Sequence, residues 1–303
     1  MSAFIEAPAS GPAQRYVQRM CRVIDHVYDH LDSTLDLDVL AEVACMSPHH
    51  WHRIYQSMYG ETLARTVRRL RLHRAAAELA YSALPLTRIA RRAAYPSLPS
   101  FSRTFKAAYG VPPARYRALG QHRSFTLQQP QPPGEALQVS IEPLPAMHLL
   151  GIAHQGSYML IGRAFDRLFA HTAASGLLQH GPRCFGLYLD DPSRVPERLR
   201  RSVAAIGPFA TPPSLPHAEL QPYTTHAGPY ATLLHRGPYD GMHASYRWLL
   251  GQWLPHSDYD AADGPLIEEY LNNPRDTAPS DLLTRIHLPL RVDGDTLPLH
   301  ASA

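Results

Sequence analysis

The sequence predicts two domains: an all-α domain made of two helix-turn-helix units, followed by an α+β domain built from a duplicated unit. Two internal repeats indicate this fold, because a feature that recurs with its key positions in step marks a repeated structural unit. Residues 47–60 (SPHHWHRIYQSMYG) align with residues 97–110 (SLPSFSRTFKAAYG). Residues 154–158 (HQGSY) return as residues 235–239 (HRGPY). Between the two repeats, residues 121–136 are polar and rich in proline, as is typical of a linker.

The composition is that of an ordinary globular protein. The 303 residues suffice for two domains, each with its own core, and 45% of them are hydrophobic and 18% charged. No apolar run approaches the roughly 18 residues of a membrane span, and the first residues do not resemble a signal peptide. Cys21, Cys45 and Cys184 are scattered and form no CxxC pair. This argues against a disulfide framework or a zinc knuckle, and we expect a cytoplasmic protein without metal or cofactor.

The linker divides the chain into parts of opposite charge. We expect the first domain over residues 12–120, a linker rich in Pro and Gln over 121–134, the second domain over 135–291 and a tail over 292–303. Residues 1–125 hold 17 Arg and Lys against 9 Asp and Glu, whereas the rest of the chain holds 12 against 17. This asymmetry favours contact of the first domain with a polyanion.

Apolar residues at helical spacing predict the elements of the first unit in order. Residues 15–31 form a helix and residues 37–44 a shorter one. After a brief turn, Ser47 suits the N-cap position and Pro48 the first position of a third helix. Two helices joined by a short turn form a helix-turn-helix unit, whose second helix enters the major groove of DNA.

The second unit repeats this order. The apolar positions of its first helix, Leu86, Ile89, Ala90 and Ala93, match Leu37, Leu40, Ala41 and Ala44. Ser97 then takes the place of Ser47 as the N-cap. A strong helix-forming segment from about Thr62 to Ala80 joins the units, and at ~1.5 Å per residue it spans ~28 Å. One DNA turn is about 34 Å, so a single chain could present both second helices to successive groove segments without dimerising.

The second helix of each unit has an inner and an outer face. Trp51 and Phe101 occupy matching inner positions, which predicts that both are core residues. The outer faces carry donors that can reach base edges and phosphates. These residues are His49, His52, Arg53 and Gln56 in the first unit and Pro99, Ser100, Ser102, Arg103 and Lys106 in the second.

With its two units, its Arg-bearing connecting helix and the ending FSRTFKAAYGVPPARYR, the first half resembles the DNA-binding domain of AraC-type transcriptional regulators. The resemblance implies that the outward residues of both second helices read bases in promoter DNA. By position these are His49, His52 and Arg53, then Leu98, Pro99, Ser100, Ser102 and Arg103. Leu98 and Pro99 depart from a hydrogen-bonding pattern, so the second helix relies more on Arg103 and on DNA shape or phosphate contacts.

Two other interpretations apply to the first half. His49, His50 and His52 could form a metal patch, but no Cys or carboxylate lies at ligand spacing from them, which disfavours that interpretation. The arginines of the connecting helix are typical of a solvent-exposed face, and we expect one or two of them to contact phosphate.

The second half repeats the order strand, glycine turn, amphipathic helix and strand, which predicts an α+β layer. Two packed copies would place a cleft on their pseudo-two-fold axis. The copies differ at an informative position, where Gly186 of the first becomes Glu268 of the second. We expect aromatic residues to surround this carboxylate, namely Phe185, Tyr188, Tyr239, Tyr246, Trp248, Trp253 and Tyr270. Such a cavity suits an apolar ligand that carries a cation.

The segment GPLIEEYLNNPRDTAPSDLLTRIHLPL and the two H-x-G-x-Y turns resemble the GyrI-like ligand-binding domain. The resemblance implies that Glu268 faces the pocket, and the alternation of side chains along a strand then turns Glu269 away from it. Joined to an AraC-type domain, it implies a regulator that senses a lipophilic, often cationic, drug and controls efflux or resistance genes, with RNA polymerase as a partner.

Two alternatives stay open for the second half. Some GyrI-like proteins resemble hydrolases of strained electrophiles, in which Glu268 would act as general base with Tyr239 or Tyr270 orienting the attacked group. The other is a scaffold for protein contacts that has lost its ligand site. A collapsed cavity around Glu268 would favour the scaffold, and a cavity lined by Tyr and Trp from both copies would count against it.

Overall fold

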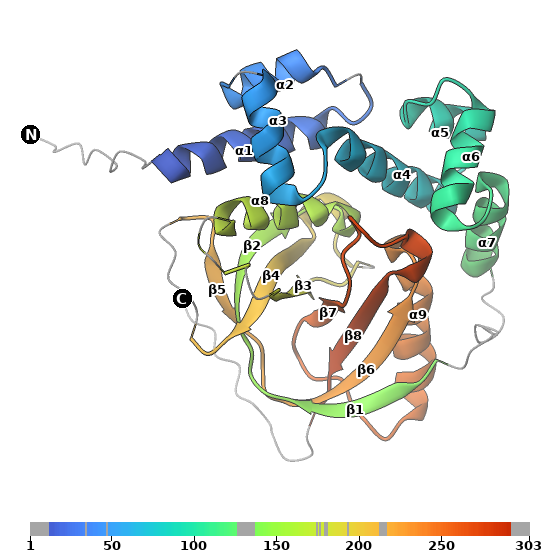
Figure 1. Ribbon diagram of the computed structural model, residues 1–303. Coiled ribbons are helices and arrows are strands. Elements are labelled where there is room, and N and C mark those ends of the chain that lie inside the picture. The colour runs from blue at the N-terminus through green and yellow to red at the C-terminus, as the bar shows by residue number, and fades with distance from the viewer. Residues whose placement is uncertain are drawn as a thin grey trace, which may run out of the picture.

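Figure 1 shows the computed structural model of the protein, with the helical half above and the sheet half below. The structure describes residues 12–33, 35–46, 48–125, 137–173, 175, 177–178, 181–192, 194–211 and 217–291. Within these ranges, no helix combines the length and apolar character that crossing a membrane requires.

Seven helices form the described part of the first half. They are α1 (Pro12–Asp29), α2 (Leu37–Ala44), α3 (Pro48–Tyr59), α4 (Leu63–Tyr81), α5 (Leu86–Arg92), α6 (Leu98–Tyr109) and α7 (Pro113–Phe125). Local capping explains several boundaries, because the side chains of Thr62 and Ser97 accept a backbone N–H bond at the starts of α4 and α6. The predicted cap Ser47 lies outside the described residues.

Two separate cores confirm the two predicted helix-turn-helix units. Helices α1 to α3 pack around Trp51 and the first half of α4, whereas α5, α6 and α7 pack around Phe101 and the second half of α4. Both aromatic rings are fully buried. Helix α4 therefore belongs to both cores and fixes the spacing between the two units (Figure 1).

The second half is one eight-stranded antiparallel sheet with the order β1-β6-β8-β7-β3-β4-β2-β5. Its strands are β1 (Val139–Leu144), β2 (His148–Gln155), β3 (Arg183–Tyr188), β4 (Arg201–Phe209), β5 (Gln221–Thr224), β6 (Gly228–Arg236), β7 (Leu266–Tyr270) and β8 (Leu283–Pro289). The order β5-β2-β4-β3 repeats as β1-β6-β8-β7 when read from the other edge. This symmetry confirms the predicted duplication, and its axis passes between β3 and β7.

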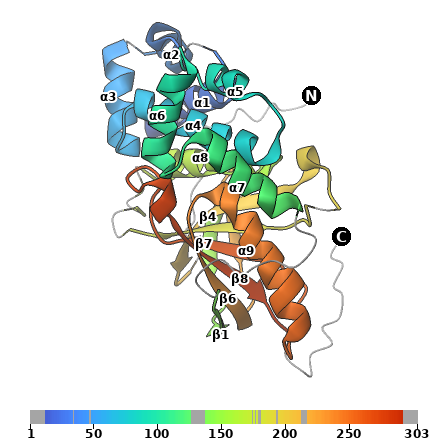
Figure 2. The ribbon, with the colours of Figure 1, turned by 90° about the vertical axis from the view of Figure 1, so that its right-hand side faces the viewer.

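Two helices lie on the same face of the sheet. Helix α8 (Gly162–Thr172) packs on β2 and β4, and α9 (Met242–Trp248) packs on β6 and β8. The other face holds a core of its own around Phe185. The middle strands β3 and β7 thus lie between the areas that α8 and α9 cover, and the first half of the chain lies over this face (Figures 1 and 2).

The structure changes one detail of the predicted boundaries. Helix α7 continues to Phe125, so the first residues of the predicted linker are helical. The remainder of that linker, residues 126–134, the first two residues of the predicted second domain and the predicted tail, residues 292–303, lie outside the described residues.

Candidate functional site

A cavity of about 1830 Å³ lies between the two halves of the chain. Its floor comes from the sheet half and includes Tyr188, Tyr239, Tyr246, Glu268 and Tyr270. Its roof comes from the helical half and includes Leu31, Tyr59, Arg65, Arg68, Arg69, His73 and Tyr81. Tyrosines from both copies of the duplicated unit therefore line one cavity, whereas the predicted tryptophans do not. The open cavity counts against the scaffold interpretation.

Glu268 lies on the floor of this cavity and is 5% exposed. Three tyrosine hydroxyls donate hydrogen bonds to its carboxylate. Tyr246 of α9 lies 2.5 Å from Oε1, whereas Tyr270 and Tyr188 lie 2.7 and 2.9 Å from Oε2. These bonds satisfy a carboxylate that the surrounding rings have removed from water.

Gly186 makes this cluster possible. It pairs with Glu268 across the pseudo-two-fold axis, between β3 and β7. A Cβ atom at residue 186 would lie 2.8 Å from the hydroxyl of Tyr270 and 2.9 Å from the ring of Tyr188. The glycine therefore leaves the space in which the rings of Tyr188 and Tyr270 reach the carboxylate of Glu268.

Burial raises the pKa of Glu268 above its ordinary value, and the bonds from Tyr246, Tyr270 and Tyr188 offset part of that rise. Burial and the nearby Glu268 charge also raise the pKa of Tyr246. The tyrosines are therefore neutral hydrogen-bond donors at neutral pH, and Glu268 is the one group of this cluster that can supply a charge. Rings around a carboxylate can bind a cation through both ion pairing and cation–π contact.

Three of the predicted pocket residues do not line the cavity. Phe185 is fully buried on the opposite face of the sheet, because neighbouring residues of a strand point to opposite faces. Trp248 and Trp253 pack on the core beneath α9 and its continuation. Trp248 follows Tyr246 by two helical positions, which turns it to a different side of the helix.

Glu269 faces away from the cavity, on the side of the sheet that also holds Phe185. Its carboxylate accepts bonds from Arg183 at 2.6 Å and Arg285 at 2.9 Å. Side chains alternate between the two faces of a strand, so these two adjacent buried glutamates face opposite sides of the sheet. Glu269 pairs with arginines, and Glu268 binds tyrosines.

The candidate DNA-contacting residues lie on α3 and α6. Gln56, Pro99, Arg103 and Lys106 are exposed, and Leu98, Ser100 and Ser102 are half-buried. The side chains of His49, His52 and Arg53 lie outside the described part of the structure. Both helices direct their C-terminal ends toward the sheet half, where Tyr59 of α3 donates a bond to the carbonyl of Asp166.

Helix α4 and the loop before α9 meet at the cavity. The ring of His73 lies edge-on to Tyr239, with 6.0 Å between the ring centroids. The next residue, Asp240, is buried and accepts bonds from the hydroxyls of Tyr81 and Tyr116. Tyr239 of the cavity floor is therefore adjacent in the chain to Asp240, which binds α4 through Tyr81 and α7 through Tyr116.

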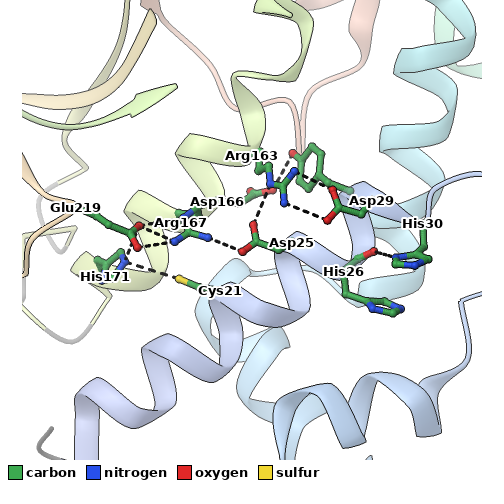
Figure 3. Close-up of polar contacts among 11 residues, drawn as sticks. Cys21, Asp25, His26, Asp29, His30, Arg163, Asp166, Arg167, His171 and Glu219 are labelled. Atoms are coloured by element: carbon green, nitrogen blue, oxygen red, sulfur yellow. Dashed lines mark hydrogen bonds and ion pairs between the residues drawn. The ribbon is translucent and has the colours of Figure 1, made fainter. Parts of the chain in front are cut away.

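Ion pairs join α1 to α8 on the other side of the interface (Figure 3). Arg163 contacts Asp25 and Asp29, each at 2.9 Å, and Arg167 contacts Asp25 at 2.6 Å. Further into the interface, Arg275 binds Asp166 of α8. No sequence pattern predicted this interface, because its partners are far apart in the chain.

Known families and proteins match both halves. The family model described as GyrI-like small molecule binding domain matches residues 137–291, and the model described as helix-turn-helix domain matches residues 40–119. The chain belongs to the GyrI-like family. An AraC-type helix-turn-helix domain precedes its GyrI-like small-molecule binding domain, as the two resemblances implied.

Curated relatives match the helical half. The uncharacterized HTH-type transcriptional regulator YbfP of Bacillus subtilis is 33% identical over 34% of this chain and 35% of its own length. The transcriptional regulator Rob of Salmonella typhimurium is 31% identical over 35% of this chain and 37% of its own length. The multiple antibiotic resistance protein MarA of Salmonella typhimurium is 30% identical over 33% of this chain and 79% of its own length. The chain thus spans about a third of YbfP and of Rob.

Solved structures resemble the GyrI-like half. The EcmrR C-terminal domain is 16% identical, with a TM-score of 0.41, and the match covers 52% of this chain and 99% of that one. A hydrolase from Listeria innocua is 14% identical, with a TM-score of 0.39, over 56% of this chain and 98% of that one.

Proposed function

We propose that this chain is a DNA-binding transcriptional regulator that senses a lipophilic cation in the cavity between its two domains and controls genes of drug efflux or resistance. The observation that carries the proposal is the shared cavity, in which the Glu268 cluster forms the floor and α4 the roof. The name of the relative MarA supports the assignment of the target genes. RNA polymerase is the further partner that we propose for the DNA-bound form.

The shared cavity also suggests how a ligand acts on DNA binding. A ligand on Glu268 would touch α4 directly, and α4 sets the spacing of the two helix-turn-helix units. A ligand changes an equilibrium only when it binds two states with different affinity. A cavity with walls from both domains provides that difference, because any relative movement of the domains changes the contacts of the ligand.

The direct test is the affinity for tetraphenylphosphonium, measured by calorimetry on the full chain. We expect saturable binding that weakens about tenfold in Glu268→Gln, because the substitution removes the charge and leaves the aromatic walls. Neutral triphenylphosphine oxide has similar rings without the charge, so its affinity should be equal in both proteins. The matched control is Glu142→Gln on the edge strand β1, which should bind like the unaltered chain.

Two results would overturn this assignment. Equal affinity of the unaltered chain and of Glu268→Gln for the phosphonium would exclude charge pairing at Glu268. Turnover of a strained electrophile that Glu268→Gln abolishes would instead support the hydrolase alternative. The relatives that match the helical half are regulators, which favours ligand binding without turnover.

The affinity for the cation should also depend on pH. Burial raises the folded pKa of Glu268, so the carboxyl group is neutral below that pKa and charged above it. We therefore expect the affinity for tetraphenylphosphonium to rise as the pH rises through this pKa. The dependence should be absent in Glu268→Gln, and a dependence of equal size in that variant would assign it to another group.

A further inference from the structure

A second cluster of ligand-type side chains lies apart from the cavity cluster, where α1 meets the GyrI-like domain. His171, His217 and Glu219 each offer one ligand atom, and these atoms lie within 4.8 Å of one another. His171 belongs to the last turn of α8, and the other two precede β5. Cys21 of α1 approaches from the DNA-binding domain, with its Sγ atom 3.8 Å from Nε2 of His171 (Figure 3).

Two distances from His171 match the edges of a tetrahedral metal site. With Zn–N of about 2.05 Å, Zn–O of about 2.1 Å and Zn–S of about 2.3 Å, the nitrogen lies ~3.4 Å from the oxygen and ~3.6 Å from the sulfur. The Nε2 atom of His171 lies 3.6 Å from Oε2 of Glu219 and 3.8 Å from Sγ of Cys21. The His217 ring lies beside His171, with 3.8 Å between the ring centroids.

From this geometry we infer that Cys21, His171, His217 and Glu219 form a binding site for Zn²⁺ or a similar divalent transition metal, which joins the DNA-binding domain to the GyrI-like domain. Thiolate, imidazole and carboxylate together are a ligand set of zinc. The site goes beyond the proposed sensing of a cation at Glu268, and it uses none of the residues of that cluster.

The charges around the cluster suit a dication. Binding displaces the proton of the Cys21 thiol to solvent, so the thiolate and Glu219 together balance the two charges of the metal. Arg167 also contacts Glu219, at 2.6 Å, and its own charge is matched by Asp25 at 2.6 Å. A carboxylate has about four lone-pair sites, which allows Glu219 to keep the arginine while it binds the metal.

The test uses Co²⁺ as a visible substitute for Zn²⁺, titrated into the full chain after treatment with a chelator. We expect one equivalent to bind with the strong visible bands of tetrahedral Co²⁺ and with a thiolate-to-cobalt charge-transfer band in the near ultraviolet. Zn²⁺ should abolish both. Cys21→Ser should lose the charge-transfer band, and His217→Ala should weaken binding at least about tenfold, because each substitution removes a metal ligand.

The exposed Cys45 provides the matched control, since Cys45→Ser should leave the spectrum unchanged. The melting temperature without metal shows whether each variant folds, and the half-buried His217 is the less disruptive position. Three results would each overturn the inference: the absence of tetrahedral Co²⁺ bands at millimolar metal, a charge-transfer band that survives Cys21→Ser, or equal affinities of His217→Ala and the unaltered chain.

Discussion

Arg275→Ala should lower the free energy of unfolding by about 3–5 kcal/mol, the usual effect of removing one partner from a buried ion pair. The Arg275 side chain is 11% exposed and pairs with Asp166, which is also buried. It also crosses to the DNA-binding domain, where it donates to the Tyr59 carbonyl at 2.7 Å and lies over the Tyr59 ring. Its loss leaves a buried carboxylate without its cation and removes a bridge between the domains.

Urea unfolding monitored by circular dichroism measures this effect. The matched control is Arg236→Ala, because Arg236 pairs with Asp281 at 3.1 Å while both side chains are largely exposed. Such a surface pair contributes about 0–1 kcal/mol. Similar losses in the two variants would contradict a special role of Arg275, and a separate unfolding transition for each domain in Arg275→Ala would show that this contact couples them.

Arg103→Ala should weaken operator binding by about 1–3 kcal/mol, or roughly 5- to 150-fold. Arg103 is an exposed arginine on α6, and the neighbouring Leu98 and Pro99 offer few hydrogen bonds of their own. The second helix-turn-helix unit should therefore depend on this one guanidinium more than the first unit depends on any single donor. Mobility-shift assays at fixed salt, on operators selected with the unaltered chain, provide the measurement.

The control for Arg103 is Arg194→Ala, which makes the same change of charge at an exposed site of the GyrI-like domain. A general electrostatic contribution would weaken DNA binding equally in both variants. Retained binding in Arg103→Ala would remove α6 as a base-reading helix and leave recognition to α3. A loss of sequence preference, with non-specific binding unchanged, would identify Arg103 as a base contact rather than a phosphate contact.

The sequence by itself determined the units of this protein. Helical spacing, the caps and the position-by-position repeat predicted both helix-turn-helix units, because these features depend on residues close together in the chain. The alternation of a strand likewise predicted that Glu268 and Glu269 would face opposite sides. The same rule excludes Phe185 from the cavity, and the prediction failed there because it grouped aromatic residues by neighbourhood rather than by face.

Only the tertiary structure decided how the two domains meet. It brought α4 over the Glu268 cluster, paired Arg275 with Asp166 and placed Cys21 beside His171, 150 residues further along the chain. None of these contacts leaves a pattern in the sequence, because a local repeat records which face of an element is apolar but not which distant element covers it. The cavity roof and the ligand cluster therefore emerged from packing, whereas the units that form them were already visible in the sequence.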